Sequence, residues 1–384
     1  MKALICGAGI AGLTLAWQLE RAGWQVEVVE KAPAFRSGGY MIDFYGPGYD
    51  VAEQMGLAPR LHELRQPIDG LTYVDRDGRR TSGIDLPQGF REVVSLLRGD
   101  LAGAIRDEVR SPVRYGTSVA ALSPHDGEVE VELTDGEHRM VDLLVGADGA
   151  HSRVRELAFG PQQRFLRYLE HHAAACVLTD SALCGRVGRR YRMLTSPGRM
   201  VGAYALDDER VALLFLHRAA GSALPADPHQ FLTDVYGDLG WIVPRALWLL
   251  PGTRELYYDQ VTQVEMDRWS SDRVVLLGDS CQAVSLFAGH GASMAMAAAW
   301  TLADELRSGK VEQALPRYEA RMRPRITDVQ RFGRSFVKWM APASSARILA
   351  RDWLLRAASL PGLDRLLMNA LSPGSQTLTA RSPR

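Results

Sequence analysis

The sequence predicts an α/β protein in which a parallel, Rossmann-like nucleotide-binding domain is interrupted by an antiparallel sheet and followed by helices. Three observations support this prediction. An apolar strand, Lys2–Cys6, leads directly into a glycine-rich turn and an apolar helix, and a second strand, Gln25–Val29, follows. Two later stretches, near residues 142–155 and 273–306, repeat the order strand, Gly/Asp loop and helix. Between them, residues 165–266 contain short segments of alternating apolar and polar character, which are typical of antiparallel strands.

The first thirty residues contain the pattern of a dinucleotide site. Gly7, Gly9 and Gly12 form G-x-G-x-x-G between the strand and the helix, and Glu30 closes the second strand. In this context the glycines allow a tight turn, close approach of a pyrophosphate and close packing of helix on strand. The start of the helix offers free N–H groups and a positive dipole to the phosphates. Glu30 is placed to accept hydrogen bonds from a ribose diol.

The bulk composition is that of an ordinary globular protein. The chain has 384 residues, 46% of them apolar and 23% charged, which is long enough for two or three domains. Lys plus Arg and Asp plus Glu both number 45, so nothing indicates a nucleic-acid partner. The four cysteines show no metal-ligand spacing and no disulfide framework. Since no signal peptide and no run of about twenty apolar residues is visible, we expect a cytoplasmic protein without a membrane span.

The nucleotide-binding domain is predicted to be discontinuous, because its pattern resumes after the antiparallel segments. A substrate domain is inserted into it, and a helical region follows. The nucleotide-binding domain comprises residues 1–65, 98–164 and 267–310. The substrate domain comprises residues 66–97 and 165–266, and the helical region comprises residues 311–384. Within the last region, Pro316, Pro324 and Pro342 are expected to act as helix breakers.

Two later loops are predicted to meet the first glycine turn. Asp148 and Gly149 follow the buried strand Leu143–Val145, and Asp279 follows Arg273–Leu277. In a doubly wound sheet such loops gather at the carboxyl ends of the strands, where ligands bind. We therefore expect one ligand site built from all three segments.

The order and spacing of these motifs, over roughly residues 1–310, resemble the single-component flavin monooxygenases of the para-hydroxybenzoate hydroxylase type. The GGYMID stretch at residues 38–43 is most similar to the compact branch that includes tetracycline-inactivating and polyketide-tailoring monooxygenases. The resemblance implies bound FAD, NAD(P)H as a transient reductant, and O2 and a bulky aromatic or polyketide-like molecule as substrates. It further implies hydroxylation through a flavin C4a-hydroperoxide, in a monomer or weak dimer, with no catalytic side chain assigned.

The same resemblance assigns residues to the cofactor. Arg98 matches an arginine that contacts the flavin and pyrophosphate region, and Asp148 belongs to a motif implicated in FAD and NAD(P)H binding. Asp279 matches an aspartate that bonds the ribitol chain, and the helix from Ala292 would aim its positive end at the flavin. The full set of predicted cofactor-binding residues is Gly7, Gly9, Ala11, Gly12, Glu30, Lys31, Arg98, Asp148, Asp279, Gly289, Gly291 and Ala292.

One departure from the family pattern leaves other functions open. Ser285 and Leu286 stand where the family usually has proline, and a rigid proline backbone helps to define the site of the oxygen reaction. An FAD enzyme with altered chemistry is therefore the alternative: an oxidative cyclase, a reductase or, ranked last, a halogenase relative. A flavin-bound sensor of an aromatic ligand, with little turnover, represents a different class of function.

Several side chains are candidates for contact with the substrate, although ordinary packing explains them equally well. Tyr204, Phe215 and His217 lie on strands expected to cover the flavin, and Phe287 lies in the last glycine loop. The role of His290, between two glycines, is left open. His171 and His172 resemble a metal pair, but neighbouring strand residues point to opposite faces, so no metal site is expected.

Overall fold

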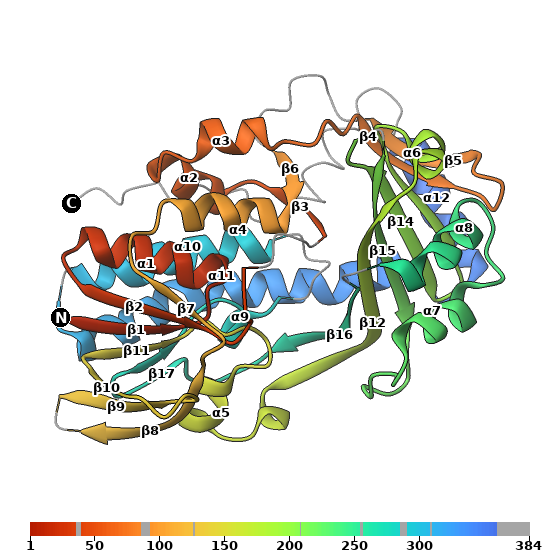
Figure 1. The fold of residues 1–384 in the computed structure, drawn as a ribbon. Coiled ribbons are helices and arrows are strands. Elements are labelled where there is room, and N and C mark those ends of the chain that lie inside the picture. The colour runs from red at the N-terminus through yellow and green to blue at the C-terminus, as the bar shows by residue number, and fades with distance from the viewer. Residues whose placement is uncertain are drawn as a thin grey trace.

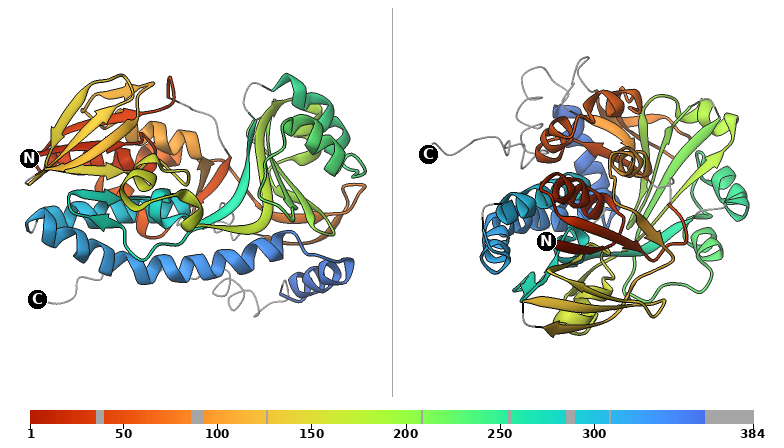
Figure 2. Two further views of the ribbon diagram at one scale, coloured as in Figure 1. Left: turned by 90° about the horizontal axis from the view of Figure 1, so that it is seen from below. Right: turned by 60° about the vertical axis from the view of Figure 1, so that its left-hand side comes forward.

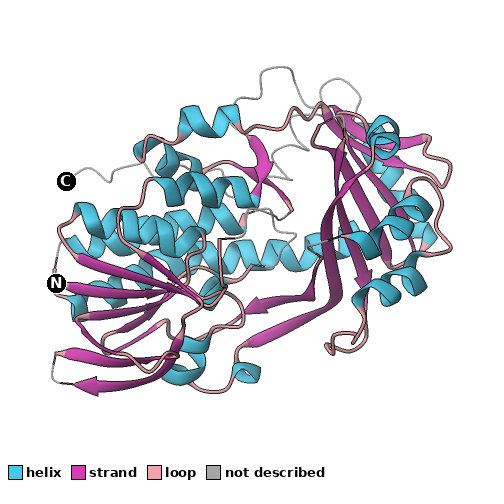
Figure 3. Cartoon of the chain, viewed as in Figure 1, coloured by secondary structure: helices cyan, strands magenta, loops and turns pink. Residues whose placement is uncertain are grey.

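The computed structural model describes residues 1–35, 40–85, 93–125, 127–207, 209–253, 256–284, 290–307 and 309–358. These residues form two sheet-containing halves that lie side by side, and one long helix runs along both (Figures 1 and 2). One half contains a mainly parallel sheet and the other a mainly antiparallel sheet, with helices packed on each (Figure 3). The predicted fold class is confirmed.

The parallel sheet has the strand order β17-β18-β11-β1-β2-β7. Its strands are β1 (Lys2–Cys6), β2 (Gln25–Glu30), β7 (Val113–Tyr115), β11 (Leu143–Gly146), β17 (Ser270–Ser271) and β18 (Val274–Leu276). β1 pairs in parallel with β2 and β11, and β11 pairs in parallel with β18. The loops after β1, β11 and β18 therefore meet at one edge of the sheet, as the three sequence motifs predicted.

Helices cover both faces of this sheet. They are α1 (Ile10–Arg21), α2 (Pro47–Gln54), α3 (Ala58–Glu63), α4 (Arg98–Asp107), α5 (Arg153–Phe159), α9 (Asp279–Gln282) and α10 (Gly291–Arg307). α1 packs against α10 and α4 on one face, and α5 packs against β11 and β18 on the other (Figure 1). Because β1 runs straight into α1, and β18 into α9, the amino ends of both helices point toward the edge where the loops meet.

Two small sheets complete this half. An antiparallel sheet of order β10-β9-β8 comprises β8 (Val119–His125), β9 (Glu128–Leu133) and β10 (His138–Val141). A two-stranded pair joins β3 (Met41–Phe44) to β6 (Val94–Leu97). Residues 94–97, which we assigned to the substrate domain, therefore do not enter its large sheet, because β6 pairs with β3 and leads directly into α4.

The second half is a seven-stranded sheet of order β16-β12-β15-β14-β13-β4-β5. Its strands are β4 (Gly70–Val74), β5 (Arg80–Asp85), β12 (Leu166–Thr179), β13 (Tyr191–Ser196), β14 (Arg199–Ala205), β15 (Arg210–Arg218) and β16 (Tyr257–Val264). All neighbours are antiparallel except β13 and β4. The far face is covered by helices α6 (Ser181–Val187), α7 (Pro228–Tyr236) and α8 (Val243–Leu249), and the short 3-10 turns Gln162–Arg164 and Leu250–Gly252 flank the sheet.

The C-terminal helices differ from the sequence prediction in one respect. α11 (Val311–Met340) runs unbroken beneath both halves and includes Pro316 and Pro324, which were expected to end helices (Figure 2). A proline inside a helix costs roughly 3 kcal/mol, but one face of α11 is buried along its whole length, from Val311 to Met340. Burial of each large apolar side chain stabilises by roughly 1.5–3 kcal/mol, which outweighs that cost. Pro342 lies between α11 and α12 (Ser345–Ala358) and does mark a helix end.

Candidate active site

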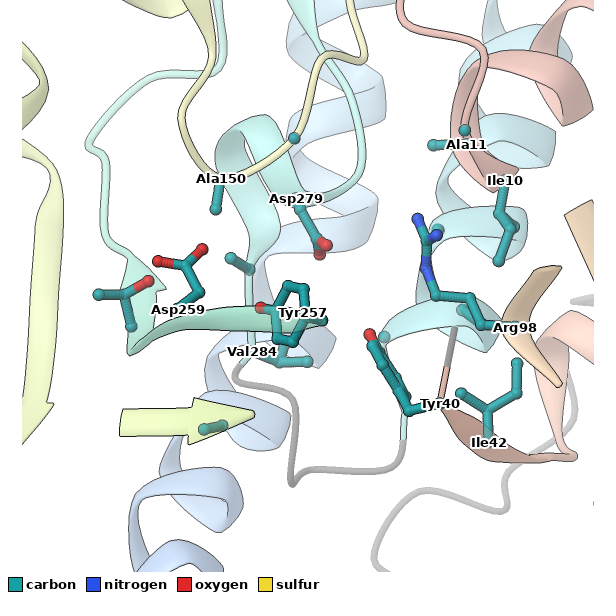
Figure 4. A pocket seen from close by; sticks show the side chains of 18 of the residues that line it. Ile10, Ala11, Tyr40, Ile42, Arg98, Ala150, Tyr257, Asp259, Asp279 and Val284 are labelled. Atoms are coloured by element: carbon teal, nitrogen blue, oxygen red, sulfur yellow. The ribbon is translucent and has the colours of Figure 1, made fainter. Parts of the chain in front are cut away.

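A pocket opens where the edge of the parallel sheet faces the seven-stranded sheet (Figure 4). The empty space in it, including part of the open solvent at its mouth, is about 1090 Å³. It is lined by residues of the first glycine turn, of the loops after β11 and β18, of α10, and of β12 and β16. All three sequence motifs therefore contribute to one pocket.

The glycine turn is shaped by close backbone contacts. Gly7 has φ +113°, and a Cβ at this position would lie 2.3 Å from the carbonyl oxygen of Ala147. At Gly12 a Cβ would lie 2.0 Å from the carbonyl oxygen of Gly7, so the helix can follow the turn only without a side chain there. A Cβ placed at Gly9 would have Arg98 Nη2 as its nearest neighbour, at 3.9 Å, so space remains on the pocket side. Gly9 and Ala11 line the pocket, and the amino end of α1 is thus open to a ligand.

Glu30 lies at the end of β2, beside the glycine turn. Its Oε2 accepts a hydrogen bond from Ala8 N at 2.9 Å, and its Oε1 accepts one from Ala32 N at 2.9 Å. The carboxylate therefore braces the turn, and its remaining lone pairs are available for a ribose diol. Lys31 is exposed. The hydrogen bond with Asp259 raises the pKa of His151, and the charge of Lys31 opposes this rise in part.

Arg98 and Asp279 project into the pocket from opposite walls (Figure 4). Arg98 begins α4, and Asp279 begins α9 directly after Gly278. Neither side chain forms a hydrogen bond with the part of the chain that the structure describes. The carboxylate of Asp279 is open to the pocket, yet the surrounding protein desolvates it and raises its pKa, which the positive charge of Arg98 partly opposes. Both groups are free to bind a ligand that carries hydroxyl and phosphate groups.

The carboxylate of Asp148, unlike that of Asp279, is hydrogen-bonded within the protein. Its Oδ1 accepts a hydrogen bond from Ser152 Oγ at 2.5 Å, and its Oδ2 accepts from Arg153 N at 2.7 Å and Val154 N at 3.2 Å. These bonds fix the start of α5 and turn the carboxylate into the protein, while the neighbouring Gly149 lines the pocket. Desolvation by burial raises the pKa of Asp148.

The buried guanidinium of Arg155 joins the loops after β11 and β18. Its Nη1 donates to the carbonyl oxygen of Ser280 at 2.8 Å, and its Nη2 donates to that of Ala150 at 2.7 Å. Because Arg155 is fully buried, it links the two loops structurally and does not bind a ligand in the pocket.

The amino end of α10 forms another wall of the pocket, through Gly291 and Ala292. The side chain of His290 turns away from the pocket: its Nε2 lies 3.0 Å from the hydroxyl of Tyr45, and its ring packs edge-on to Phe332. This histidine therefore ties the start of α10 to the segment between β3 and α2. Gly289 lies outside the described residues.

Two tyrosine rings in the pocket were not recognised from the sequence as site residues. Tyr40 and Tyr257 have ring centroids 6.0 Å apart, and the side chain of Tyr257, at the start of β16, is 41% exposed (Figure 4). Asp259 and Val261 follow on the same face of β16. Tyr40 belongs to the GGYMID stretch, which pointed to the vicinity of the cofactor, whereas nothing in the local pattern of residues 257–261 indicated a site.

Of the four candidate substrate residues, the three that the structure describes, Tyr204, Phe215 and His217, do not line this pocket. Phe215 and His217 lie on the far face of the seven-stranded sheet, where both pack against Tyr236 of α7. His217 Nδ1 is 3.1 Å from the hydroxyl of Tyr236, and burial lowers the pKa of His217 to about 4. This placement does not support substrate contact by Phe215 or His217. Tyr204 is on the other face but is buried beside Leu97, and Phe287 lies outside the described residues.

Within the described residues, no group of three or more His, Cys, Asp or Glu side chains is arranged to hold a metal ion. In that part of the chain no helix is both long enough and apolar enough to span a bilayer. The pocket fits a dinucleotide, because the open amino end of α1, Arg98 and Asp279 line it, and the carboxylate of Glu30 lies beside the glycine turn.

Comparison with known proteins agrees with this geometry. Residues 1–333 match the family described as "FAD binding domain". The chain belongs to this family. A flavin-dependent monooxygenase from an unknown prokaryotic organism is 30% identical over 342 residues, which cover 86% of this chain and 88% of that protein. An uncharacterised protein of Mycobacterium tuberculosis (strain ATCC 25618 / H37Rv) is 32% identical over 322 residues, 79% of this chain and 84% of that protein.

Solved structures of this family share the fold. The tetracycline destructase Tet(55) is 27% identical with a TM-score of 0.81, over 93% of this chain and 95% of that one. Klebsiella pneumoniae HpxO, complexed with FAD and uric acid, has a TM-score of 0.80 at 24% identity, over 97% of this chain and 95% of that one. The chain is thus a flavin-dependent monooxygenase with FAD as its cofactor, and the resemblance to the para-hydroxybenzoate hydroxylase type is confirmed.

Proposed function

We propose that this enzyme consumes NAD(P)H and O2 to hydroxylate a bulky aromatic or polyketide-like small molecule. The observation that carries the proposal is the composition of the pocket. One wall carries the groups suited to a dinucleotide, and the opposite wall, on β12 and β16, carries the exposed Tyr257 and aliphatic side chains, with Asp259 and other polar residues between them. FAD bound there would supply the oxygen chemistry, through the C4a-hydroperoxide that the family resemblance implies.

The protein's own groups hold and orient the cofactor. The amino end of α1 would bind the pyrophosphate, Glu30 the ribose diol and Asp279 the neutral ribitol hydroxyls, since a carboxylate facing a phosphate would repel it. The amino end of α10 would place positive potential beside the flavin ring, where reduction develops negative charge. Arg98 would add positive charge on the other side.

The aromatic wall supports an aromatic substrate. Tyr40 and Tyr257 present ring surface to the pocket, and tilted or offset contacts between aromatic rings contribute roughly 0.5–1.5 kcal/mol beyond the area they bury. Val261 and Val284 line the pocket nearby. Such a surface favours a planar, extended ligand and excludes water from the reacting centre once that ligand is bound.

The reductant is proposed to bind transiently at the surface near Asp148. The sequence contains no second G-x-G-x-x-G after a strand, so NAD(P)H has no domain of its own. A second pocket, lined by His151, Gln162 and Gln260 among others, adjoins the first, and Gln260 and Thr262 line both. Its hydrogen-bonding groups support a polar ligand next to the flavin site.

We further propose the domain division predicted above, except that residues 94–97 belong with the nucleotide-binding domain because β6 pairs with β3. We also propose a monomer or weak dimer as the working form, and a cytoplasmic location. The segment from residue 285 to 289, where proline is missing, lies outside the described residues.

The function can be tested by measuring NAD(P)H oxidation, O2 uptake and H2O2 release by the FAD-loaded protein with a panel of polycyclic phenols. We expect slow oxidation with H2O2 release alone, and faster oxidation with less H2O2 and a hydroxylated product when a fitting phenol is added. Product formation without NAD(P)H, with one O2 consumed and one H2O2 released per product and no oxygen atom added to the product, would instead identify an oxidative cyclase. Flavin reduction with no oxygenated product from any phenol would favour a reductase.

A further inference from the structure

Two buried glutamines lie behind the pocket wall. Gln263 is on β16 and has no exposed surface, and Gln330 is on α11 and is 8% exposed. They lie on elements separated in sequence by the loop after β18, α9 and α10. Neither residue lines the pocket, and neither belongs to a motif of the dinucleotide site.

The two side-chain amides use all four of their N–H groups on backbone carbonyls. Gln263 Nε2 donates to the carbonyl oxygens of Val284 at 3.1 Å and Gln330 at 2.8 Å. Gln330 Nε2 donates to the carbonyl oxygens of Val264 at 2.8 Å and Ala283 at 3.1 Å. Each amide NH2 carries two hydrogens, so both donors are fully satisfied.

A charged neighbour sets the orientation of the first amide. Arg334 Nη1 donates to Gln263 Oε1 at 2.9 Å and also contacts Glu265 Oε1 at 3.2 Å. Because a guanidinium can only donate, the oxygen of Gln263 faces Arg334 and its NH2 faces the carbonyls. The arrangement therefore has one orientation, with no equivalent flipped form.

Two of the four carbonyls held in this way belong to the wall of the pocket. Ala283 and Val284 line the pocket and directly follow α9, the helix that begins with Asp279. Their only other backbone hydrogen bond to β16 runs from Val264 N to the carbonyl oxygen of Ala283, at 3.3 Å, among those of the described residues. Without the glutamines, the carbonyl of Val284 would lose its donor in a buried setting.

We infer that Gln263 and Gln330 are positioning residues that clamp the Ala283–Val284 wall, so that α11 braces the cofactor pocket from behind. This inference rests on the proposed function, since it concerns the same pocket. The clamp fixes the path of the backbone at Ala283 and Val284, which precede in sequence the two residues that replace the family's proline. It acts through the Ala283–Val284 backbone, and the glutamines themselves touch neither cofactor nor substrate.

The test compares Gln330→Met with a matched control, Gln18→Met. Methionine keeps the approximate size of glutamine and removes its hydrogen bonds. Gln18 is also a buried glutamine, 3% exposed, but it lies on α1, and among the described residues its amide nitrogen has no hydrogen-bond partner. For each full-length protein we would measure the melting temperature, the dissociation constant and visible spectrum of FAD, and amide hydrogen exchange across residues 278–291.

We expect Gln330→Met to melt at lower temperature, to exchange faster over residues 278–284 and to bind FAD about tenfold more weakly, the equivalent of about one lost buried hydrogen bond. Gln18→Met removes an amide nitrogen that has no hydrogen-bond partner among the described residues, so it should lower neither the melting temperature nor the FAD affinity and should leave the exchange unchanged. Equal FAD affinity and unchanged exchange in Gln330→Met would overturn the inference. If that variant does not fold, Arg334→Met provides a milder change, because it leaves both glutamines in place and removes the contacts of Arg334 with Gln263 and Glu265. It should change exchange and affinity in the same direction by a smaller factor. Since neither readout requires turnover, a protein that binds FAD but oxidises no NAD(P)H would refute the proposed function and leave this test intact.

Discussion

Glu30 allows the folding of the glycine turn and the binding of the cofactor to be measured separately. Its two carboxylate oxygens each accept one backbone hydrogen bond at 2.9 Å, from Ala8 and from Ala32. In Glu30→Gln one oxygen becomes an NH2 group, which would then face a backbone N–H. The variant therefore loses one of the two bonds and places two donors against each other, and it also lacks the negative charge expected to bind the ribose.

The magnitude follows from these contacts. A hydrogen bond to a charged group contributes about 1.5–3 kcal/mol, and we take about 2 kcal/mol because Glu30 is only partly buried. With an unfolding entropy of about 2.1 cal/mol/K per residue, a chain of 384 residues would lose only 2–3 °C in melting temperature without FAD, by this order-of-magnitude estimate. Loss of the charged acceptor for the ribose diol should raise the dissociation constant of FAD by about 10- to 100-fold.

Glu27→Gln serves as the control. Glu27 lies on the same strand, where its carboxylate pairs with Arg139 at 2.8 Å, away from the pocket. A partly exposed ion pair of this kind contributes about 0–1 kcal/mol, so the control should lose some stability and bind FAD normally. Melting curves of the FAD-free proteins and fluorescence titration of FAD would provide the two quantities. If Glu30→Gln and Glu27→Gln bind FAD equally well, Glu30 is not part of the ribose site.

Three further predictions concern charged groups. Arg98→Met should raise the dissociation constant of FAD by about 10- to 100-fold without changing the circular dichroism; loss of the native spectrum would show that Arg98 is structural. Asp279→Asn should weaken FAD binding yet raise the melting temperature of the FAD-free protein at neutral pH. The reason is that desolvation by the surrounding protein raises the pKa of Asp279, so its ionised form opposes folding. A lower melting temperature would contradict this. His217 has its pKa lowered from 6.5 to about 4, so the unfolded chain binds the proton first and stability should fall by up to about 3 kcal/mol as the pH drops from 6.5 to 4. Urea unfolding across this range should show a weaker dependence on pH in His217→Gln, and an unchanged slope would exclude His217 as the cause.

The dinucleotide half could be predicted from the sequence because its signals are local. Gly7 and Gly12 are required where the backbone of one segment touches that of another, and the residues around them form a strand and a helix with clear periodicity. The three loops end strands that pair in parallel, so their meeting follows from the connectivity of a doubly wound sheet. For the same reason Asp279 could be placed in the pocket from its position after a buried strand.

Other features were decided by tertiary packing alone. The alternation of β15 shows that Phe215 and His217 share a face, but not which face, and the helices α7 and α8 cover that face in the folded protein. Pro316 and Pro324 disfavour a helix locally, and only burial against both halves keeps α11 continuous.

The pocket wall is the clearest example of a feature that the local sequence pattern could not predict. Tyr257, Gln263 and Gln330 carry no local pattern that distinguishes them from ordinary strand and helix residues. Tyr257 reaches the pocket because β16 is the edge strand beside β12, and the glutamines meet Ala283 and Val284 because α11 crosses behind that strand. The sequence by itself determined the cofactor turn and its family, since those depend on short-range backbone geometry. The aromatic wall and its support depend on segments brought together over long sequence separations, and only the tertiary structure could decide them.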